Sequence, residues 1–546
     1  MYLPDLIRQD ASASNDTIIY VFVYNPLAQN RSTYVRVPVA NEAMFRVERI
    51  DGGTNSFSKS ALKDPRSANE ANKQYELLFP TGPLPPISIV VFSITKEQHL
   101  DPIPKNTASS EIRSRRLRTG TRESLEFKNS VMSATFDVST GLLTGMSADG
   151  VVLPINQTWG YYTSFDSALD STNKEQNSGA YIFRPSIPNQ KLIHLTPKRG
   201  AAKFVSTPVS IDVYAFFEEP WIWQTTRMQG NSPFVEIEYH IGPIPIDDNR
   251  GKEIVTRYSA PIGSNGEFFT DSNGREFQKR KRNIRPTWNL DVFEPVAGNY
   301  YPVNAAMYIE DPFSALAVLV DRSQGGTSLI DGSVEIMVQR RTLADDSRGV
   351  DEPLNETCGG MSPYPPYGLN ERIGDGVTIV GKHRVRVGKG MEGASIARSE
   401  MDDTFAESLV FFGSTATSKP AKFQRGVYKG LLNPLPKNVM IVTFSSQERS
   451  AKTFLIRIAH QYNAEEDENM GKSQNVDLSL LFANQNITSI KETSLTGNQN
   501  LEFAKSQRFY RKDIKGDMRR DETSLSPTQV NLLPMEIRTF IISLTP

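Results

Sequence analysis

The sequence predicts an all-β protein made of several antiparallel β-sandwich domains. Apolar and polar residues alternate over many short segments, and this period of two is typical of strands in a sheet that buries one face. The 546 residues include 34 prolines and 36 glycines, which divide the sequence into short segments separated by turns. Only one segment, residues 395–411, has the character of a helix.

The clearest strand pattern lies in residues 233–242, PFVEIEYHIG. Val235, Ile237, Tyr239 and Ile241 fall on one face, and Glu236, Glu238 and His240 fall on the other. This alternation predicts a strand with its polar face in water. Residues 35–39, 334–339 and 383–387 repeat the pattern, whereas residues 17–26 are apolar on both faces, as in a central strand.

The chain is long enough for several domains. Residues 1–100 are expected to form a small N-terminal β-sandwich. Residues 101–124, rich in proline, serine and basic side chains, lack hydrophobic periodicity and are interpreted as a linker. Residues 125–412, which contain many aromatic side chains, are expected to form a large central β domain, and residues 413–546 a C-terminal β-sandwich.

Composition argues against several classes of protein. The 61 Lys and Arg residues against 62 Asp and Glu residues give a net charge of −1, so no nucleic acid or acidic membrane partner is expected. No apolar run reaches the roughly 18 residues of a membrane-spanning helix. The N-terminus shows no secretory signal pattern, so either the protein stays in the cytosol or its true start is missing from this sequence.

The single cysteine, Cys358, excludes an intrachain disulfide and is interpreted as an ordinary loop thiol. Five N-x-S/T sequons occur, at Asn15, Asn30, Asn156, Asn355 and Asn486. Chance alone places about five in a chain of this composition, so the sequons permit a secretory route without establishing one.

Metal-binding candidates are few among the five histidines. His99 and Asp101 have an H-x-D spacing, but no rigid element is predicted to hold them. The Glu236, Glu238 and His240 face could supply three ligands, although neighbours two residues apart on a strand are about 7 Å apart and would have to converge. A polar face in water is the alternative interpretation.

Nucleophile and phosphate-binding motifs are absent from the sequence. His460 shares its face with apolar residues and is expected to be a hydrogen-bonded core residue. Asp345 and Asp346 could bind Ca²⁺ or act as acid and base, but adjacent residues on a strand face opposite ways, which favours a turn. By themselves the residues describe a multi-domain β protein without an active site of its own.

Several ordered strings carry a specific resemblance. They are SGAYIFRP at 178–185, GKEIV at 251–255, TDSNGRE at 270–276, RPTW at 285–288, EPVAGNYYPVN at 294–304, DRSQGG at 321–326, DGSVEIMVQRR at 331–341, DDSRGV at 345–350 and PMEIRTF at 534–540. Together they closely resemble the C-terminal half of lysosomal-type α-mannosidases, glycoside hydrolase family 38. The string VYNPL at 23–27 extends the resemblance to the first β unit.

The resemblance implies that the central domain is a large β-supersandwich of the galactose-mutarotase type. It also implies that the zinc ligands, the aspartate nucleophile and the general acid belong to an N-terminal α/β catalytic domain and the helical segment after it, because the H-x-D-x-G-W and H-H-D-A motifs do not occur in this sequence. Zinc is therefore expected in the complete family enzyme, and none is expected on this chain. We assign no catalytic residue here.

The resemblance does imply substrate-binding residues. The tyrosine of the SGAY string, Tyr181, and one arginine of the RRTLADD segment, Arg340 or Arg341, correspond to residues that reach the sugar. A phenol and a guanidinium both donate hydrogen bonds to sugar oxygens, and only one of two adjacent arginines on a strand can face the site. The alternative is that Tyr181 is a core residue and that the arginines pair with Asp345 or Asp346.

Three functions follow from these alternatives. The chain is expected to be the C-terminal portion of a retaining α-mannosidase that acts on N-glycan-derived mannosyl oligosaccharides, to complete the sugar site of the missing catalytic domain, and to be inactive alone. The alternatives are a non-catalytic carbohydrate-binding or scaffold protein and a processed subunit with a large apolar interface. The family resemblance implies a lysosomal, vacuolar or secreted location.

Overall fold

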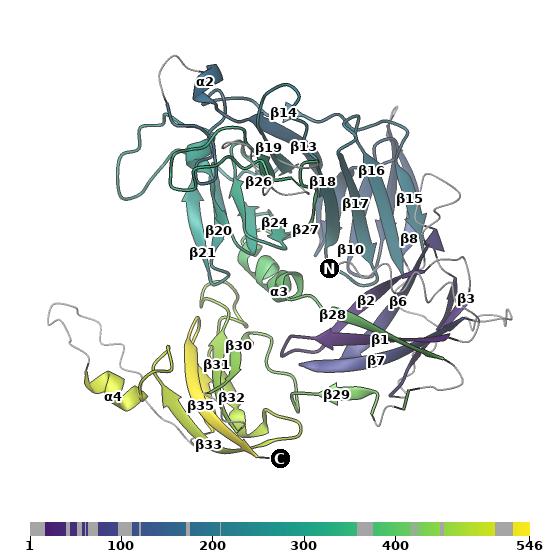
Figure 1. The fold of residues 1–546 in the computed structure, drawn as a ribbon, viewed down its shortest axis with the longest axis vertical. Coiled ribbons are helices and arrows are strands. Elements are labelled where there is room, and N and C mark those ends of the chain that lie inside the picture. Colours follow the sequence, from purple (N-terminus) through teal and green to yellow (C-terminus); the bar gives the residue numbers. More distant parts are fainter. Residues whose placement is uncertain are drawn as a thin grey trace, which may run out of the picture. The chain divides into compact units, whose positions relative to one another are not determined.

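The computed structural model describes residues 17–39, 44–51, 57–60, 62–63, 75–96, 112–119, 122–170, 175–207, 209–357, 375–416, 421–422, 425–447, 452–507 and 528–545. Antiparallel sheets account for most of this structure, which confirms the predicted all-β class (Figure 1). Contacts divide the chain into two compact units, residues 107–405 and a second unit of residues 1–106 with 406–546. The domain bounds expected from the sequence remain a prediction.

The described residues of the 107–405 unit form three sheets. The nine-stranded sheet runs in the order β15 (Lys203–Ser206), β16 (Ser210–Phe216), β17 (Ile222–Gln229), β18 (Val235–Ile241), β27 (Ile379–Lys389), β24 (Ser314–Val320), β23 (Ala306–Glu310), β20 (Glu267–Ser272) and β21 (Glu276–Lys281). The six-stranded sheet runs β14 (Ile193–His194), β13 (Asn156–Thr163), β19 (Lys252–Ser259), β26 (Ser333–Arg341), β25 (Gln324–Thr327) and β22 (Tyr301–Val303). The five-stranded sheet runs β12 (Val151–Pro154), β11 (Leu143–Ala148), β10 (Met132–Asp137), β9 (Arg122–Lys128) and β8 (Arg113–Thr119).

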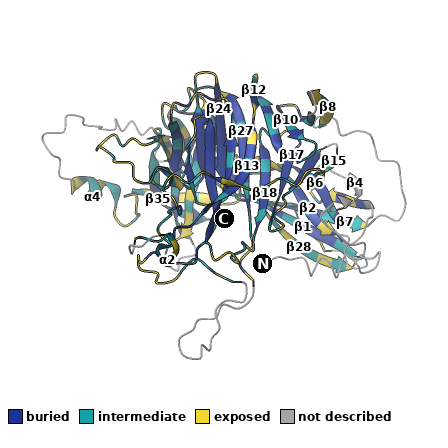
Figure 2. Cartoon of the chain, turned by 90° about the horizontal axis from the view of Figure 1, so that it is seen from above, coloured by how far each residue is buried: buried dark blue, intermediate teal, exposed yellow. Residues whose placement is uncertain are grey.

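One hydrophobic core joins these three sheets, as a supersandwich requires. It contains Phe136 from the five-stranded sheet, Trp159 and Tyr258 from the six-stranded sheet, and Tyr239 from the nine-stranded sheet. The strands around it are the most deeply buried part of the unit (Figure 2). Every second residue of β18 enters the core, which confirms the strand predicted from the period of two.

The opposite face of β18 is not the open polar face that we expected. Glu236 pairs with Arg384 at 3.0 Å, Glu238 pairs with Arg227 at 2.8 Å, and the ring of His240 stacks on Trp223. These side chains are mostly withdrawn from water because each lies against a charged or aromatic neighbour. Although burial disfavours its charge, the Arg227 guanidinium holds the pKa of Glu238 well below its usual range.

The predicted helix is confirmed as α3 (Gly393–Phe405), although the chain becomes a strand again before residue 411. Its apolar stripe, including Ile396 and Met401, packs on Tyr308 and Leu319 of the nine-stranded sheet. Figure 1 shows the α3 ribbon beside the strands of this sheet. The other helical segments described are α2 (Ser167–Asp170), α4 (Leu501–Ser506), η2 (Ala297–Asn299) and η3 (Leu478–Leu480). No helix among the described residues is long and apolar enough to span a membrane.

Part of the segment interpreted as a linker forms strands. Residues 113–119 are β8, which pairs with β9 at residues 122–128. Almost every described side chain of β8 is exposed, and four of its seven residues are arginine. An exposed edge strand needs only backbone pairing on one side, so it carries no hydrophobic period, and its charges discourage pairing with other chains.

In the part of the second unit that the structure describes, four sheets form two sandwich-like cores. Their strands are β28 (Leu409–Ala416), β1 (Thr17–Asn25), β7 (Ser88–Lys96), β3 (Met44–Arg49), β4 (Phe57–Ser60) and β29 (Val427–Lys429) in one sheet, and β2 (Arg31–Val39), β6 (Tyr75–Leu84) and β5 (Leu62–Lys63) in the next. The other two contain β30 (Val439–Ser446), β31 (Thr453–His460), β35 (Ile537–Thr545) and β33 (Asn486–Thr493), and β32 (Gln474–Asp477) with β34 (Gln529–Leu532).

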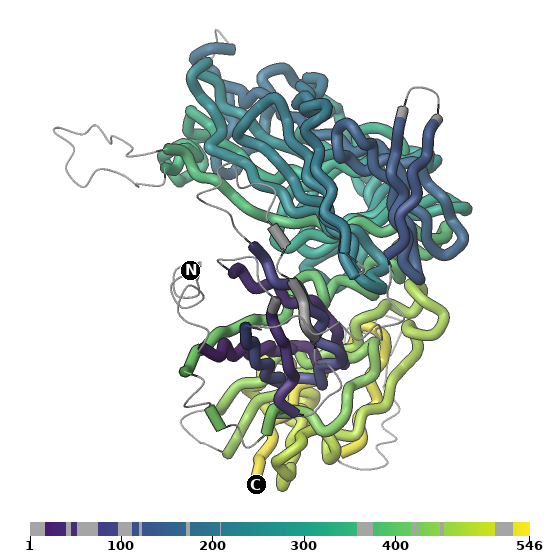
Figure 3. Tube along the Cα trace, turned by 90° about the vertical axis from the view of Figure 1, so that its right-hand side faces the viewer, coloured from purple at the N-terminus to yellow at the C-terminus, as the bar shows by residue number. Residues whose placement is uncertain are grey.

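Strands far apart in the sequence are neighbours in this unit. The β28 strand pairs with β1 along eight residues, and Figure 3 shows this late segment in green beside the purple N-terminal strands. The predicted strands at 17–26 and 35–39 are confirmed as β1 and β2. His460 is fully buried, with Nδ1 3.0 Å from the Tyr462 carbonyl, which confirms the expected hydrogen-bonded core histidine.

Candidate functional site

The SGAYIFRP string forms a loop over the outer face of the six-stranded sheet. Phe183 anchors the loop, because its ring packs edge-on against Tyr300 with ring centroids 4.9 Å apart and also contacts Tyr162. Both tyrosines donate hydrogen bonds to the fully buried Glu335. Phe183 therefore packs against two tyrosines whose hydroxyl groups are held by Glu335 of β26.

Arg340 holds the loop from the sheet side. Its Nη2 donates to the carbonyl of Ile182 at 2.6 Å and to the hydroxyl of Ser178 at 3.2 Å. The same nitrogen pairs with Glu253 of β19 at 3.2 Å, and Glu253 is fully buried. Burial raises the pKa of Glu253, although Arg340 and the neighbouring serine hydroxyls act in the opposite direction.

Asp346 holds the loop from the other side. One carboxylate oxygen accepts the backbone N–H of Tyr181 at 2.6 Å and that of Ile182 at 2.8 Å. Gly179 lies directly against this carboxylate, since a Cβ on Gly179 would come within 2.7 Å of Asp346. A larger residue at position 179 would therefore push the loop away from Asp346.

Tyr181 itself projects from this fixed loop. Its side chain is 66% exposed, and its phenol makes no hydrogen bond with the residues that the structure describes. The alternative that Tyr181 is a core tyrosine is therefore wrong. The ring is available to a ligand or partner while its backbone is immobilised by neighbouring groups.

The two arginines lie on opposite faces of the sheet, as strand alternation requires. Arg340 lies under the Tyr181 loop, whereas Arg341 donates to the side chain of Asn355 at 2.7 Å and to the carbonyl of Ile244. Arg340 pairs with Glu253, so the alternative pairing of that arginine with Asp345 or Asp346 is wrong. Of the two candidates, only Arg340 is brought together with Tyr181.

Asp345 and Asp346 form the turn that we expected. Asp345 accepts the N–H of Ser347 at 2.9 Å, and Asp346 accepts that of Arg348 at 3.2 Å. The sequence did not reveal that Asp346 also binds the Tyr181 loop, 165 residues earlier in the chain. Both segments belong to strings that carry the family resemblance, but no local pattern pairs them.

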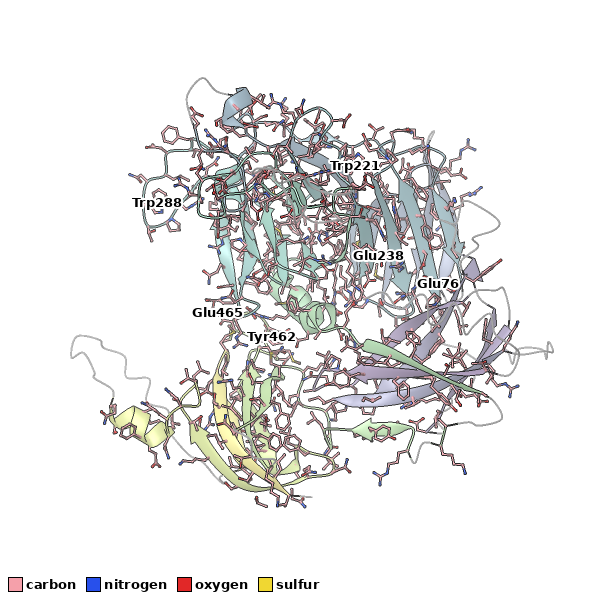
Figure 4. The ribbon with its side chains drawn as sticks, viewed as in Figure 1. Glu76, Trp221, Glu238, Trp288, Tyr462 and Glu465 are labelled. Carbon is pink, nitrogen blue, oxygen red and sulfur yellow. The ribbon has the colours of Figure 1, made fainter. Side chains whose placement is uncertain are left out.

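A second loop is tied to the first. The guanidinium of Arg184 donates to Glu294 at 2.8 Å and lies 4.2 Å from the centre of the Phe165 ring. The loop before Glu294 exposes four large apolar side chains, Ile284, Trp288, Val292 and Phe293. Trp288 lies on the outer side of this loop (Figure 4). Such a concentration of exposed apolar groups is typical of a surface that contacts another molecule.

The candidate metal ligands do not form a metal site in the described residues. No group of three or more His, Cys, Asp or Glu side chains is placed to hold a metal ion there. Glu236 and Glu238 are engaged by arginines, and His240 lies between Glu238 and Trp223. His99, Asp101 and Cys358 lie outside the described residues. The donor set that the structure shows therefore does not fit the zinc of the family.

Comparison with known proteins gives consistent matches over the chain. Residues 127–348 match the glycosyl hydrolases family 38 C-terminal domain, and residues 438–540 match the glycosyl hydrolases family 38 C-terminal beta sandwich domain. Lysosomal alpha-mannosidase of Homo sapiens is 34% identical over 536 residues, which are 96% of this chain and 49% of that protein. Alpha-mannosidase of Canavalia ensiformis is 33% identical over 559 residues, which are 98% of this chain and 54% of that protein.

Solved structures support the same fold. The alpha-mannosidase from Enterococcus faecalis V583 superposes with a TM-score of 0.54 at 11% identity, covering 98% of this chain and 57% of that one. At this identity the likeness concerns the fold alone. The chain spans about half the length of the curated relatives that it matches. It therefore belongs to glycosyl hydrolase family 38 and contains the two C-terminal domains of that family.

Proposed function

We propose that this chain supports and completes the sugar site of an α-mannosidase whose catalytic residues lie in an N-terminal half that this sequence does not contain. The observation that carries the proposal is the exposed Tyr181 side chain on a loop whose backbone is held on both sides. The coverage of only about half of each relative is consistent with a missing catalytic half.

Tyr181 would act on the sugar in two ways. Its hydroxyl donates and accepts hydrogen bonds with sugar hydroxyls, and its ring packs on the apolar face of the pyranose. Arg340 is the arginine that we propose at the same site, because its guanidinium lies under the Tyr181 loop. Arg341 faces Asn355 and remains the less favoured candidate.

The covalent steps would belong to the catalytic half. A retaining glycosidase uses two carboxyl groups about 5–5.5 Å apart, one as nucleophile and one as acid and then base. In the described residues, the Asp346 carboxylate accepts the backbone N–H of Tyr181, and the Glu253 carboxylate pairs with Arg340, so both groups are engaged within the chain. We therefore propose that the chain alone does not hydrolyse mannosides.

The catalytic half needs a surface on which to dock. The exposed apolar residues of the 284–293 loop supply such a surface close to the Tyr181 loop, through the Arg184–Glu294 pair. Mannosyl oligosaccharide is then the substrate of the combined protein. The lysosomal names of the mammalian relatives support a lysosomal, vacuolar or secreted location as part of the same proposal.

The experiment measures release of nitrophenol from an aryl α-mannoside in zinc buffer. The chain alone is expected to be inactive, and the chain combined with a catalytic half that contains the H-x-D-x-G-W motif is expected to be active. In the combined protein Tyr181→Phe should lower kcat/KM about tenfold or more, because it removes a hydroxyl that binds substrate. Tyr428→Phe, at a half-exposed tyrosine of the other unit, is the matched control and should leave kcat/KM unchanged.

Two results would contradict the proposal. Hydrolysis by the isolated chain would show that it has catalytic groups of its own. An unchanged kcat/KM in Tyr181→Phe would remove Tyr181 from the sugar site. Mannoside binding by the isolated chain, without hydrolysis in any combination, would favour the carbohydrate-binding or scaffold function instead.

A further inference from the structure

The peptide units before and after Tyr181 both contact polar side chains. The Ala180–Tyr181 peptide has its carbonyl 3.5 Å from Nη1 of Arg340 and its N–H bound to Asp346 at 2.6 Å. The next peptide has its N–H bound to the same Asp346 oxygen at 2.8 Å. Because a peptide unit is planar, fixing the units on both sides of a residue fixes its φ and ψ.

The Asp346 carboxylate is suited to this task. It is fully buried and forms no ion pair with any residue that the structure describes, so backbone amides are the groups that stabilise its charge. Hydrogen bonds from N–H groups to a carboxylate are about twice as strong as those to a neutral acceptor. If the loop moved away, the buried carboxylate would lose these donors at a large cost in free energy. This cost keeps the loop in place.

The turn around Asp346 adds two further attachments. Its own carbonyl accepts a hydrogen bond from the side chain of Gln176, and the carbonyl of Asp345 accepts one from Asn177 at 2.8 Å. The loop is therefore bound to the turn both before and after Gly179. The neighbouring Asp345 carboxylate contributes nothing to this contact, since its bond within the described residues is to the N–H of Ser347.

We propose that Asp346 is the positioning residue that sets the direction of the Tyr181 side chain, with Arg340 holding the opposite side of the loop. Asp346 does not touch the sugar and acts through Tyr181. The consequence for the reaction rests on the proposed function of Tyr181, whereas the structural effect on the loop does not.

The structural effect is measured on the isolated chain by amide hydrogen exchange over residues 178–184. In Asp346→Asn the amides of Tyr181 and Ile182 should exchange at least about tenfold faster than in the parent chain, because the charged acceptor is lost. Asp345→Asn, one residue away in the same turn, is the matched control and should leave both rates unchanged. Equal rates in the parent chain and in folded Asp346→Asn would overturn the proposal.

A more severe variant, Asp346→Ala, extends this test. It removes the acceptor completely and should expose both amides further. The tryptophan fluorescence of residues 107–405 reports whether each variant remains folded, since all four tryptophans lie in that unit. If the Ala variant does not fold, the Asn variant, which keeps the shape of the side chain, still decides the outcome.

The functional effect is measured in the combined enzyme with a double-mutant cycle. Asp346→Asn should lower kcat/KM about tenfold when Tyr181 is present and less than about twofold in the Tyr181→Phe background, because a residue that acts through Tyr181 has little to position without its hydroxyl. Equal losses in both backgrounds would show that Asp346 acts independently of Tyr181. If Tyr181→Phe has no effect while the exchange result holds, the proposed function fails and the positioning contact stands.

Discussion

The carboxylate of Glu400 on α3 lies 3.2 Å from Nη1 of Arg386 on β27, in a position almost withdrawn from water. Burial raises the pKa of Glu400 to about 7, with Asp403 adding to the shift and the two arginines at 386 and 384 acting against it. A group at the interface between the helix and the nine-stranded sheet therefore titrates close to neutral pH.

We expect Glu400 to make the 107–405 unit more stable as the medium becomes mildly acidic. Its folded-state pKa lies above the ordinary glutamate value of 4.5, so its contribution is fully present below pH 4.5 and is lost as pH rises through about 7. The total change is on the order of 3 kcal/mol or less. Glu400→Gln should flatten this part of the pH profile, measured by urea unfolding with tryptophan fluorescence. The exposed Glu392→Gln is the control, and an unchanged profile in Glu400→Gln would contradict the expectation.

His383 should have the opposite effect. It is fully buried, with Nδ1 3.1 Å from the Tyr258 hydroxyl and Nε2 2.8 Å from the side chain of Gln324, and burial lowers its pKa to about 4. The unfolded chain binds a proton near pH 6.5, so the stability that His383 contributes is present above pH 6.5 and is lost as pH falls toward 4.

The prediction for His383 concerns the slope of stability against pH. In His383→Gln the free energy of unfolding should fall less between pH 6.5 and 4 than in the parent chain, whatever the cost of the substitution at neutral pH. The exposed His194→Gln serves as the control, because it keeps the buried imidazole in place. If the free energy of unfolding of His383→Gln falls with pH as steeply as that of the parent chain, the His383 imidazole does not cause the loss of stability between pH 6.5 and 4.

Removal of the Glu335 side chain should lower the free energy of unfolding more than removal of most other side chains near Tyr181. It is fully buried and accepts hydrogen bonds from Tyr162, Tyr300 and Arg257. Glu335→Ala leaves the arginine charge without its partner and should lower the free energy of unfolding by about 3–5 kcal/mol. Glu123→Ala breaks an exposed pair with Arg116 and should cost less than about 1 kcal/mol. Similar losses in the two variants would contradict the assignment of Glu335 as the support of the loop.

The structure separates the glycosylation sequons. Asn30, Asn156 and Asn486 are exposed, whereas Asn355 is half-buried and its side chain accepts a hydrogen bond from Arg341. When the chain is secreted from a eukaryotic host, the first three should carry glycan and Asn355 should not. Mass spectrometry after enzymatic deglycosylation in ¹⁸O-water identifies occupied sites, and an occupied Asn355 would contradict the expectation. Asn15 lies outside the described residues.

Much of the fold could be predicted because strand faces leave a local pattern. The β18 alternation and the apolar stripe of α3 are both visible within about ten residues of sequence. The arginine-rich β8 left no such pattern, because an exposed edge strand is held by its backbone bonds to β9 and has no side that must be apolar.

The candidate site was only partly predictable. Tyr181 and the arginine pair came from the family resemblance, and strand alternation required that Arg340 and Arg341 face opposite ways. The arginine that lies beside Tyr181 is the one on the sheet face that the 178–185 loop covers. The packing of Phe183 against Tyr162 and Tyr300 places the loop on that face.

The all-β class, the main strands, the helix α3 and the family could be derived from the order of the residues alone. The contact of Asp346 with the Tyr181 backbone and the pairing of the outer face of β18 became visible only in the folded chain. The difference comes from the range of the interactions. Strand periodicity is a property of neighbouring residues, whereas the buried Asp346 carboxylate binds N–H groups 165 residues away that folding brings to it.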